Sequence, residues 1–550
     1  METETSPRDR IDPSNSLPTE AQIEAIARSG TGIWSHFKVA PQERPKFWFM
    51  CAIFLIIAYI YSVMRDMKDV LVTERLDPAS LSYLKMLFVT PISILVVVLL
   101  QKPLSRYGVG PVFNAVVIVF GIYNVVYGLV VIPLQNTLEP SPFLFRDSFG
   151  DGKMAVRGLE ALLGVLLTLN SYTTTIAYVF AELWGNVVLS LLFLNYSNMN
   201  CSYSQSMRFT PCLFIFSNVG LFFSGLTMLG ICFVHPYLGY ISNRWILRSV
   251  FIGAGLLCLF IIYLKNRLER TVLSVPICIT EGSGVRKQKA HVSLLAGLKE
   301  LFGSKVLFNT SLIVFLYNLC TNMVEASYKS CMRVCADQKN KAVGIHVMGR
   351  QAVMQLVIAM IVIVLLLTPF STIIQRKGIY SVAVVPPVFA LVALVGVFGL
   401  AAYNTAASKK SFEWLNTMFA GASAHISAEE FVGLICVSGF KILKYGAFDI
   451  CKEAISMKIS ASIRSMFKSV VDGVCGKLGK SGGGLLTTLT NLVLNTNDIR
   501  TAAPFSLVLV VLFCFAWIKS VGYLSRKYEE SVKGNCDIDL DPFVVKKVKG

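Results

Sequence analysis

The sequence predicts an all-α integral membrane protein with about twelve transmembrane helices arranged in two six-helix halves. Of its 550 residues 54% are hydrophobic and 15% are charged, whereas soluble domains carry about 25% charged residues. The mean hydropathy is +0.61, and the apolar residues form runs close to the ~20 residues that cross a bilayer. A polar, basic segment interrupts these runs near the middle of the chain.

Twelve apolar spans can be placed in order along the chain. Six precede the central polar segment, near 47–64, 82–100, 111–132, 160–198, 207–233 and 245–264, and six follow it, near 306–328, 343–367, 379–402, 428–450, 464–495 and 503–524. Basic residues interrupt the tenth and eleventh spans. We therefore predict five segments, namely an N-terminal tail (1–46), a first half (47–264), a linker (265–305), a second half (306–525) and a C-terminal tail (526–550).

An even number of spans places both ends of the chain on one side of the membrane. Basic residues in the central linker, such as Arg286 and Lys287, place that side in the cytoplasm. The first 46 residues are polar and mix acidic with basic side chains, so neither a transit peptide nor a secretory signal is predicted.

Six spans on each side of a polar linker are typical of a transporter whose two halves rock about a central site. A multi-span scaffold without a site is the alternative. The chain carries 51 Lys and Arg against 33 Asp and Glu, a net charge of +18. Contact with anionic lipid explains part of this excess, and a cationic path for an anionic substrate is the second interpretation.

The run CGKLGKSGGG near the C-terminus looks at first like a phosphate-binding loop. Such a loop requires G-x-x-x-x-G-K-[ST] between a strand and a helix. The position that needs the first glycine is Val474, and the flanking sequence is typical of helices. The sequence therefore predicts that Lys480 belongs to a helix and not to a nucleotide-hydrolysing loop.

Charge stands at four places where a lipid-facing helix would not carry it, since an ionisable residue at the centre of a span costs about 2.5–3.5 kcal/mol unless it faces a partner or a cavity. At the end of the first span, Arg65, Lys68 and Asp69 share one helical face, as a binding group or as a snorkelling cluster. In the fourth span, Glu182 and Asn186 are one turn apart on the same face, and Glu182 is either a binding residue or a structural carboxylate paired with a lysine from another helix.

The other two places lie in the second half. Glu325 and Lys329 have the spacing of a simple ion pair on one helix. Along the tenth span, residues at helical spacing form one stripe that consists of Lys441, Lys444, Phe448 and Lys452. Three lysines with an aromatic ring suit the binding of a phosphate chain with a stacked base. The alternative is an amphipathic helix that lies on anionic lipid headgroups.

Four motifs resemble the nucleotide transporters of plastids, rickettsiae, chlamydiae and microsporidia. They are RDMKDVLV, AELWGNVVLSLLF, KYGAFDICKE and LGKSGG, and that family shows RDTKDxLV, AELWGSVVLSLLFW, KYSLFDPTKE and LGKSGG in the same order. The resemblance covers about 47 to 525. It implies a twelve-helix fold of the major facilitator type and exchange of ATP against ADP. The chain departs from the family motifs at Met67, Ile450 and Cys451, and with this divergence it resembles a microsporidian member of the family.

The resemblance also assigns site residues. It implies that Lys68, Glu182, Glu325 and Lys452 are the critical charged residues, and it places a polar asparagine at Asn218. On this interpretation Lys68 and Lys452 neutralise the phosphates. Further members of the predicted binding site are Arg65, Asn186, Lys444 and Lys480.

The substrates implied are ATP and ADP, with GTP, GDP and phosphate as further candidates. We expect no enzymatic activity, no cofactor or metal and no nucleic-acid partner, but a monomer in contact with membrane lipids. The resemblance implies the plasma membrane of an intracellular parasite, with a mitosome membrane as the alternative. The competing functions are an ion- or proton-coupled nucleotide symporter, with Asp69, Glu182 or Glu325 as the coupling site, and a lipid-binding membrane protein without transport.

Overall fold

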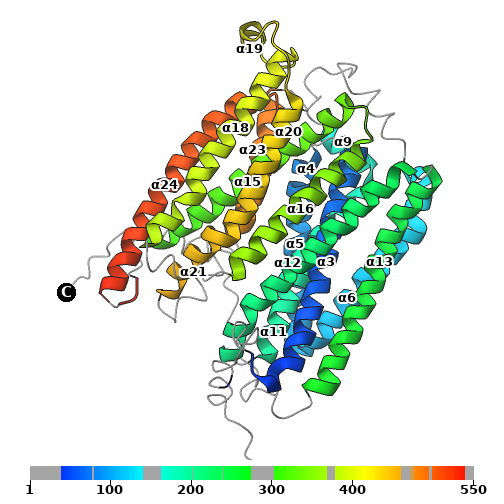
Figure 1. The fold of residues 1–550 in the computed structure, drawn as a ribbon, viewed down its shortest axis with the longest axis vertical. Helices are drawn as coiled ribbons and strands as arrows, with labels where there is room; N and C mark the ends of the chain where they lie inside the picture. Colours follow the sequence, from blue (N-terminus) through cyan, green and yellow to red (C-terminus); the bar gives the residue numbers. More distant parts are fainter. Residues whose placement is uncertain are drawn as a thin grey trace, which may run out of the picture.

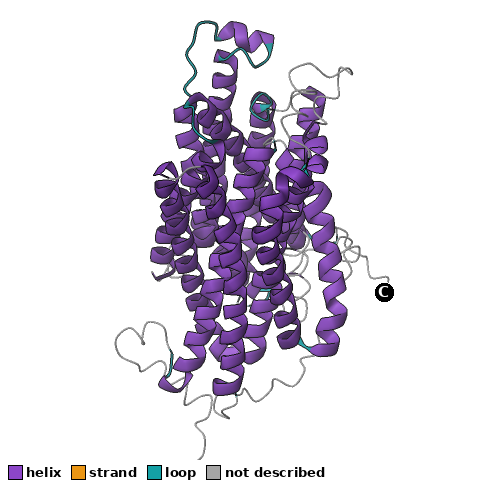
Figure 2. Cartoon of the chain, turned by 90° about the vertical axis from the view of Figure 1, so that its right-hand side faces the viewer, coloured by secondary structure: helices purple, strands orange, loops and turns teal. Residues whose placement is uncertain are grey.

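A computed structural model gives the fold of the chain as a bundle of long helices (Figure 1). It describes residues 39–76, 80–139, 163–201, 203–237, 240–273, 303–367, 378–459, 475–494, 498–534 and 536–538, with the single positions 26, 467 and 471. In the view from the side, the helices of this described part run nearly parallel to one another (Figure 2).

The first half contains six membrane-crossing segments, several of them continued by short π-helical stretches. They are α3 (Arg44–Arg75); α4 (Ser80–Tyr83) with η3 (Leu84–Val89) and α5 (Thr90–Tyr107); α6 (Val109–Val126) with η4 (Tyr127–Val131) and α7 (Ile132–Leu138); α10 (Tyr172–Leu183) with η6 (Trp184–Phe193) and α11 (Leu194–Asn200); α12 (Tyr203–Val234); and α13 (Tyr240–Arg267) with η8 (Leu268–Val272). The short helices η2 (Pro41–Glu43), α9 (Leu163–Asn170) and η7 (His235–Tyr237) flank them.

The second half is built in the same way. Its segments are α15 (Lys305–Gln338); α16 (Val343–Leu367); α18 (Val385–Ala407); α20 (Ile426–Leu443) with η10 (Lys444–Phe448) and α21 (Asp449–Met457); α23 (Gly476–Leu494); and α24 (Ala503–Lys533). The short helix α19 (Glu413–Met418) projects from the bundle between α18 and α20 (Figure 1). We call the end where α3 begins and α24 ends the terminal end, and the opposite end the distal end.

The prediction of an all-α membrane protein is confirmed. Eleven helices in the described part of the chain are long and apolar enough to span a bilayer. The eleventh predicted span, 464–495, is represented by α23, which packs along α15 inside the bundle. Most of the positions from 460 to 474, and most of the predicted linker and tails, lie outside the described residues.

The first span is longer than predicted. The sequence predicts an end near Met64, but α3 continues to Arg75. The charged cluster that includes Lys68 and Asp69 therefore lies within the helix, where both residues are buried, with 4% and 5% exposure. This excludes the snorkelling interpretation of that cluster. At the other end of the chain α24 runs to Lys533, into the segment predicted as a tail.

The two halves repeat one pattern of contacts that no residue-level repeat in the sequence indicates. In the first half α3 packs against α12 and α10, and in the second half α15 packs against α23 and α20. The outer pairs α6 with α13 and α18 with α24 also correspond. Between the halves, α12 packs against α16, and α23 packs against α4 and η3. Such a relation between two halves is characteristic of secondary transporters.

Glycine permits two of the equivalent helix contacts. A Cβ atom added at Gly220 of α12 would stand 2.5 Å from the carbonyl oxygen of Leu55 on α3. A Cβ atom added at Gly479 of α23 would stand 2.6 Å from the carbonyl oxygen of Phe315 on α15. Small residues allow helix backbones to approach closely within membranes. The run LGKSGG thus lies in a helix and brings α23 against α15; the prediction that it is not a phosphate loop is confirmed.

We predict that Gly220→Ala and Gly479→Ala each lower the thermal stability of the purified protein, because overpacking of a tight contact costs about 1–3 kcal/mol. Gly230→Ala on α12 and Gly399→Ala on α18 are matched controls, since nothing lies within 4 Å of the added Cβ. Size-exclusion chromatography after a heating series measures the midpoints. Equal midpoints for both pairs of variants would contradict the close-packing role.

Candidate functional site

The central site begins with an ion pair between α3 and α10. The Nζ of Lys68 lies 2.8 Å from Oε1 of Glu182 and 3.2 Å from Oδ1 of Asp69. The same ammonium group stands 3.9 Å from the ring centroid of Tyr178, in a cation–π contact. Two predicted site residues, Lys68 and Glu182, are therefore direct partners.

The residues that follow Glu182 explain its position. The indole nitrogen of Trp184 donates to the carbonyl oxygen of Ile57 at 3.1 Å and fixes this segment to α3. The absence of a side chain at Gly185 makes room for Tyr61, because an added Cβ would lie 2.3 Å from its ring. The glutamate thus faces the charges of α3, while the tryptophan and glycine hold the two helices together.

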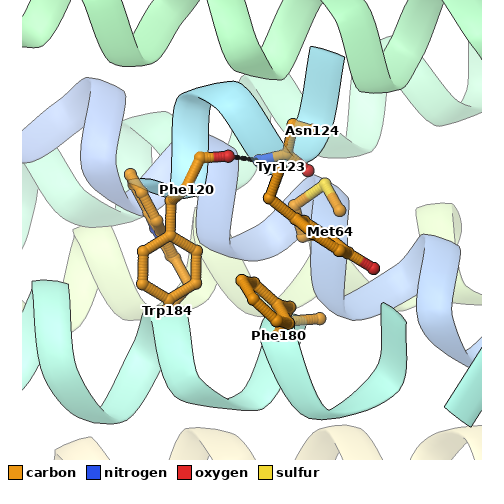
Figure 3. A pocket seen from close by; sticks show the side chains of 7 residues that line it. Met64, Phe120, Tyr123, Asn124, Phe180 and Trp184 are labelled. Atoms are coloured by element: carbon orange, nitrogen blue, oxygen red, sulfur yellow. Dashed lines mark hydrogen bonds between the residues drawn. The ribbon is translucent and has the colours of Figure 1, made fainter. Parts of the chain in front are cut away.

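The opposite face of α10 borders a small cavity within the first half. Aromatic rings line most of it, among them Phe120, Tyr123 and Phe180, with Trp184 at one side (Figure 3). The rings of Tyr123 and Phe180 stack at 3.8 Å between centroids. This cavity lies inside one half and away from the charges on the other face of α10, so we assign it to packing.

Asp69 joins the two halves of the protein. Its Oδ2 lies 2.8 Å from Nζ of Lys329 on α15 and accepts a hydrogen bond from Gln351 on α16 at 3.2 Å. One turn earlier on α3, Asp66 accepts a hydrogen bond from Gln355 of α16. Toward the distal end, Arg333 of α15 donates to the carbonyl oxygen of Leu76 at 2.9 Å. Polar contacts between the halves therefore gather in the distal part of the bundle.

Glu325 has a different partner from the one that its spacing predicts. Its Oε1 lies 3.2 Å from Nζ of Lys441 on α20, whereas Lys329 contacts Asp69. The prediction of a simple pair between Glu325 and Lys329 on one helix is wrong, because the other helices offer each residue a partner that faces it.

Lys85 is a functional candidate that the sequence analysis missed. It lies in the π-helical segment η3 and donates from Nζ to Oδ1 of Asn322 on α15. Asn322 donates in turn to the backbone carbonyl of Lys480 at 2.8 Å. Lys85 also lies within electrostatic reach of Glu182 and Glu325. The sequence did contain a signal for this residue, because Lys85 is a charged residue within the predicted span 82–100.

Three further lysines of the predicted site are Lys480, Lys444 and Lys452. Lys480 lies on α23 within electrostatic reach of Glu182. Lys444 lies in η10, 5.5 Å from the ring of Tyr445. Lys452 lies on α21 with Nζ 3.2 Å from Asp449, about 16 Å of helical rise beyond Lys441 toward the terminal end.

The remaining predicted residues are polar or lie at the edge of the cluster. The guanidinium of Arg65 is 3.7 Å from Asp66 and 5.6 Å from the ring of Tyr61. Asn186 is partly buried one turn after Glu182. Asn218 is buried on α12, where its side-chain amide donates to the carbonyl oxygen of Phe214 at 2.8 Å.

The structure contradicts the aromatic part of the predicted stripe. Phe448 is buried inside the second half, stacked on Tyr317 at 4.4 Å and edge-on to Trp517. The stripe assumed an unbroken α-helix, but the π-helical segment Lys444–Phe448 changes the rotation of the helix. The lysines and Phe448 therefore do not share one exposed face, and Phe448 cannot stack on a base.

Taken together, the chain forms a membrane-embedded bundle of two related halves, with cations from both halves around Glu182 and Glu325, and this is the fold of the major facilitator type. The fold is shared with a bacterial homologue of the iron transporter ferroportin in an inward-facing state, at a TM-score of 0.53 and 14% identity over 86% of this chain and 98% of that one. It is also shared with the nucleoside transporter NupG, at a TM-score of 0.52 and 12% identity over 86% and 99%.

Residues 31–528 match the family described as TLC ATP/ADP transporter, and the chain belongs to that family. ADP,ATP carrier protein 1 of Paranosema grylli is 40% identical over 96% of both chains. ADP,ATP carrier protein 1 of Encephalitozoon cuniculi (strain GB-M1) is 38% identical over 96% of this chain and 95% of the relative. ADP,ATP carrier protein 1 of Chlamydia muridarum is 25% identical over 87% and 88%.

We predict that Asp69→Asn loosens the distal contact between the halves, because it removes the charge that holds Lys329. Hydrogen–deuterium exchange should quicken at the distal end of α3 and at the start of α16. Asp449→Asn is the matched control, since Asp449 contacts Lys452 on its own helix. Unchanged exchange in Asp69→Asn, or equal changes in both variants, would contradict the role of Asp69.

Proposed function

We propose that this protein exchanges ATP for ADP across a membrane by alternating access and so imports ATP into a parasite cell from its host. The observation that carries the proposal is the buried set of cations from both halves, paired with Glu182, Glu325 and Asp69. A triphosphate is a polyanion that can take the place of several carboxylates at once. The names of the related ADP,ATP carriers support the same substrates.

In the proposed cycle the phosphates compete with carboxylates for the lysines. The phosphate chain takes Lys68 from Glu182, while Lys68 stays beside Asp69 on α3, and it takes Lys441 from Glu325. Once Asp69 also loses Lys329, the distal contact between the halves opens. Because the polar contacts between the halves lie toward the distal end, we infer that the structure represents the state open toward the terminal end, the end that the sequence predicts to be cytoplasmic.

Exchange requires that the empty carrier reorients poorly. Unpaired lysines do not supply this barrier, because Lys68, Lys329 and Lys441 are each paired with a carboxylate in the structure. The barrier comes instead from separating Asp69 from Lys329 without a replacement, because an uncompensated buried charge costs about 3–5 kcal/mol. Bound nucleotide supplies the replacement, so reorientation in both directions depends on it.

The lysines beyond the centre give the nucleotide a path. Lys444 and Lys452 follow Lys441 along the tenth membrane-crossing segment toward the terminal end. We propose that they receive the phosphates of nucleotides that enter or leave at that end. Lys480 and Arg65 add to the positive field, and Lys480 acts there as a charge within a helix and not as part of a hydrolytic loop.

Asn186 and Asn218 are the candidates for recognising the base or the ribose, since the carboxamide of each side chain can both donate and accept hydrogen bonds. A shared purine site also admits GTP and GDP as further substrates, and phosphate as a co-transported ion. We place this integral, multi-pass protein in the plasma membrane of the parasite and propose that it works as a monomer.

We predict that Lys68→Ala and Lys452→Ala each abolish uptake of labelled ATP into proteoliposomes loaded with ADP, while the protein remains inserted. Arginine at either position should restore little transport, because its planar fork does not reproduce a compact ammonium group. Lys102→Ala, at the exposed end of α5, is the control and should transport normally. Near-normal transport by either site variant would exclude that lysine from the binding site.

We predict that nucleotide gradients alone drive the exchange. Uptake of ATP should require internal ADP and should proceed without a proton or sodium gradient. Exchange of ATP⁴⁻ for ADP³⁻ moves one net charge across the membrane. The exchange rate should therefore depend on the clamped membrane potential, because moving one charge across 100 mV changes the free energy by about 2.3 kcal/mol. Phosphate that travels with ADP should reduce this sensitivity. An absolute ion-gradient requirement would favour the symporter, and binding of lipid without any uptake would favour the lipid-binding alternative.

A further inference from the structure

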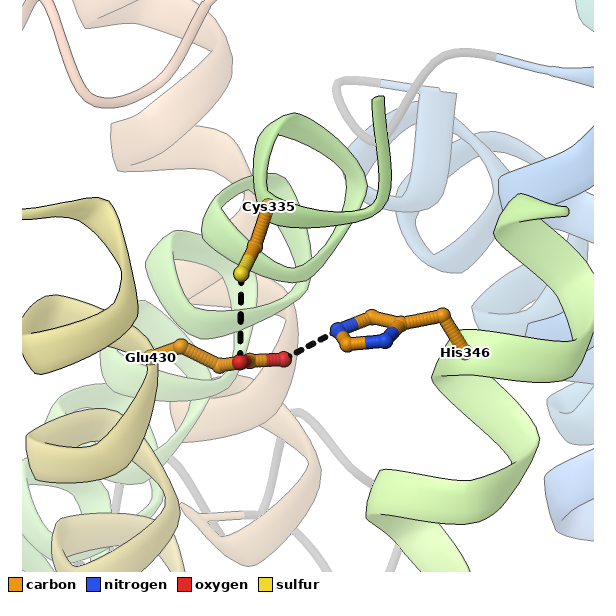
Figure 4. Close-up of side chains that lie close together, drawn as sticks. All are labelled: Cys335, His346 and Glu430. Atoms are coloured by element: carbon orange, nitrogen blue, oxygen red, sulfur yellow. Dashed lines mark hydrogen bonds and ion pairs between the residues drawn. The ribbon is translucent and has the colours of Figure 1, made fainter. Parts of the chain in front are cut away.

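A second cluster of reactive side chains lies at the distal end of the second half. Cys335 is near the end of α15, His346 near the start of α16, and Glu430 near the start of α20. The hairpin between α15 and α16 brings the first two residues together, and α20 adds the carboxylate (Figure 4). None of these residues takes part in the proposed nucleotide path.

The three side chains converge on one point. Cys335 donates from Sγ to Oε2 of Glu430 at 3.2 Å, and Nε2 of His346 contacts Oε1 of the same carboxylate (Figure 4). One ligand atom from each residue lies within 4.8 Å of the other two. Cys335 and Glu430 are fully buried, and the side chain of His346 is 7% exposed.

We propose that Cys335, His346 and Glu430 form a site for a borderline-soft divalent cation of the zinc class. Thiolate sulfur, imidazole nitrogen and carboxylate oxygen are the three donor types that zinc takes from proteins. Magnesium and calcium prefer oxygen donors alone. Three protein ligands leave a fourth position for water. Binding releases the proton of the Cys335 thiol, because the thiolate is the ligand.

A guanidinium group also contacts this carboxylate. Arg350 donates from Nε to Oε1 of Glu430 at 3.1 Å and from Nη2 to Oε2 at 2.9 Å, and Lys339 lies 3.7 Å away. A divalent cation and Arg350 would compete for the same oxygens. The side chains of Arg350 and Lys339 are about one-third exposed, at 36% and 33%, so they can withdraw into water and leave an entry path.

Metal binding at this place would act on the helices that close the distal end. It would clamp α15 to α16 and α20. Lys329 of α15 lies less than two turns before Cys335, and Gln351 of α16 directly follows Arg350. Both residues hold Asp69 of the first half. The proposed metal site and the distal contact between the halves therefore share the helices α15 and α16 but no side chain.

Cobalt is the probe for the experiment, because a thiolate ligand gives Co²⁺ an intense near-ultraviolet charge-transfer band. The full-length protein, purified in detergent with a tag that contains no histidine, is titrated with Co²⁺ and then with Zn²⁺. We expect one Co²⁺ per chain, the thiolate band, and displacement of both by Zn²⁺. Cys335→Ser should abolish the band, and His346→Asn should weaken binding at least about tenfold.

Two further variants make the test specific. Cys331→Ser removes another buried thiol on α15, which contacts the carbonyl oxygen of Ile426, and it should keep the band. Arg350→Gln removes the competing guanidinium and should tighten Co²⁺ binding; a purely structural ion pair gives no such gain. The proposal is overturned if no thiolate band forms at stoichiometric Co²⁺ in both the wild type and Arg350→Gln, or if Cys335→Ser retains the band.

Discussion

Charges inside a membrane-spanning bundle must find partners, and Asp69 meets this constraint by contacting both halves at once. Lys68 lies beside it on α3, Lys329 reaches it from α15, and Gln351 reaches it from α16. Neither half can satisfy this carboxylate group alone at the observed geometry. Because the contact couples the halves through charge, a mobile polyanion can compete with it, whereas an apolar contact would respond only to shape. The arrangement thus links substrate chemistry to the position of the halves.

Glycines supply the rigid frame on which this charge network depends. Gly220 and Gly479 bring equivalent pairs of helices into backbone contact, and Gly185 lets Tyr61 pack beside Glu182. A Cβ atom at Gly220 or Gly479 would stand 2.5 or 2.6 Å from a backbone oxygen, so the facing helix would have to shift, and a Cβ atom at Gly185 would displace the ring of Tyr61. The glycines of AELWG and LGKSGG therefore have a mechanical role, and the charged residues beside them have the electrostatic one.

The sequence was sufficient for the helical class and the approximate spans, and it singled out Lys68 and Glu182 as charged residues within the membrane. Apolar length and intramembrane charge are local signals that can be found without the structure. It was insufficient for the partner of Glu325, since Lys329 is nearer in sequence but Lys441 lies opposite in space. The burial of Phe448 depends on a π-helical segment that helical periodicity cannot anticipate. Lys85 was missed because its partner Asn322 lies 237 positions away along the chain.

The two halves are alike in helix packing, and each also holds a charged pair between two of its own helices. The first half holds Lys68 against Glu182 within itself, while the second half holds Glu325 against Lys441. Each half thus keeps an internal pair that can open to receive phosphate oxygens and close again afterwards. The link between Asp69 and Lys329 is the pair that spans both halves. In the proposed cycle, a substrate that opens only one internal pair leaves this link in place, so a short anion would bind without reorienting the carrier. A phosphate chain long enough to reach both halves can release the link, which relates the length of the transported anion to the step that moves it.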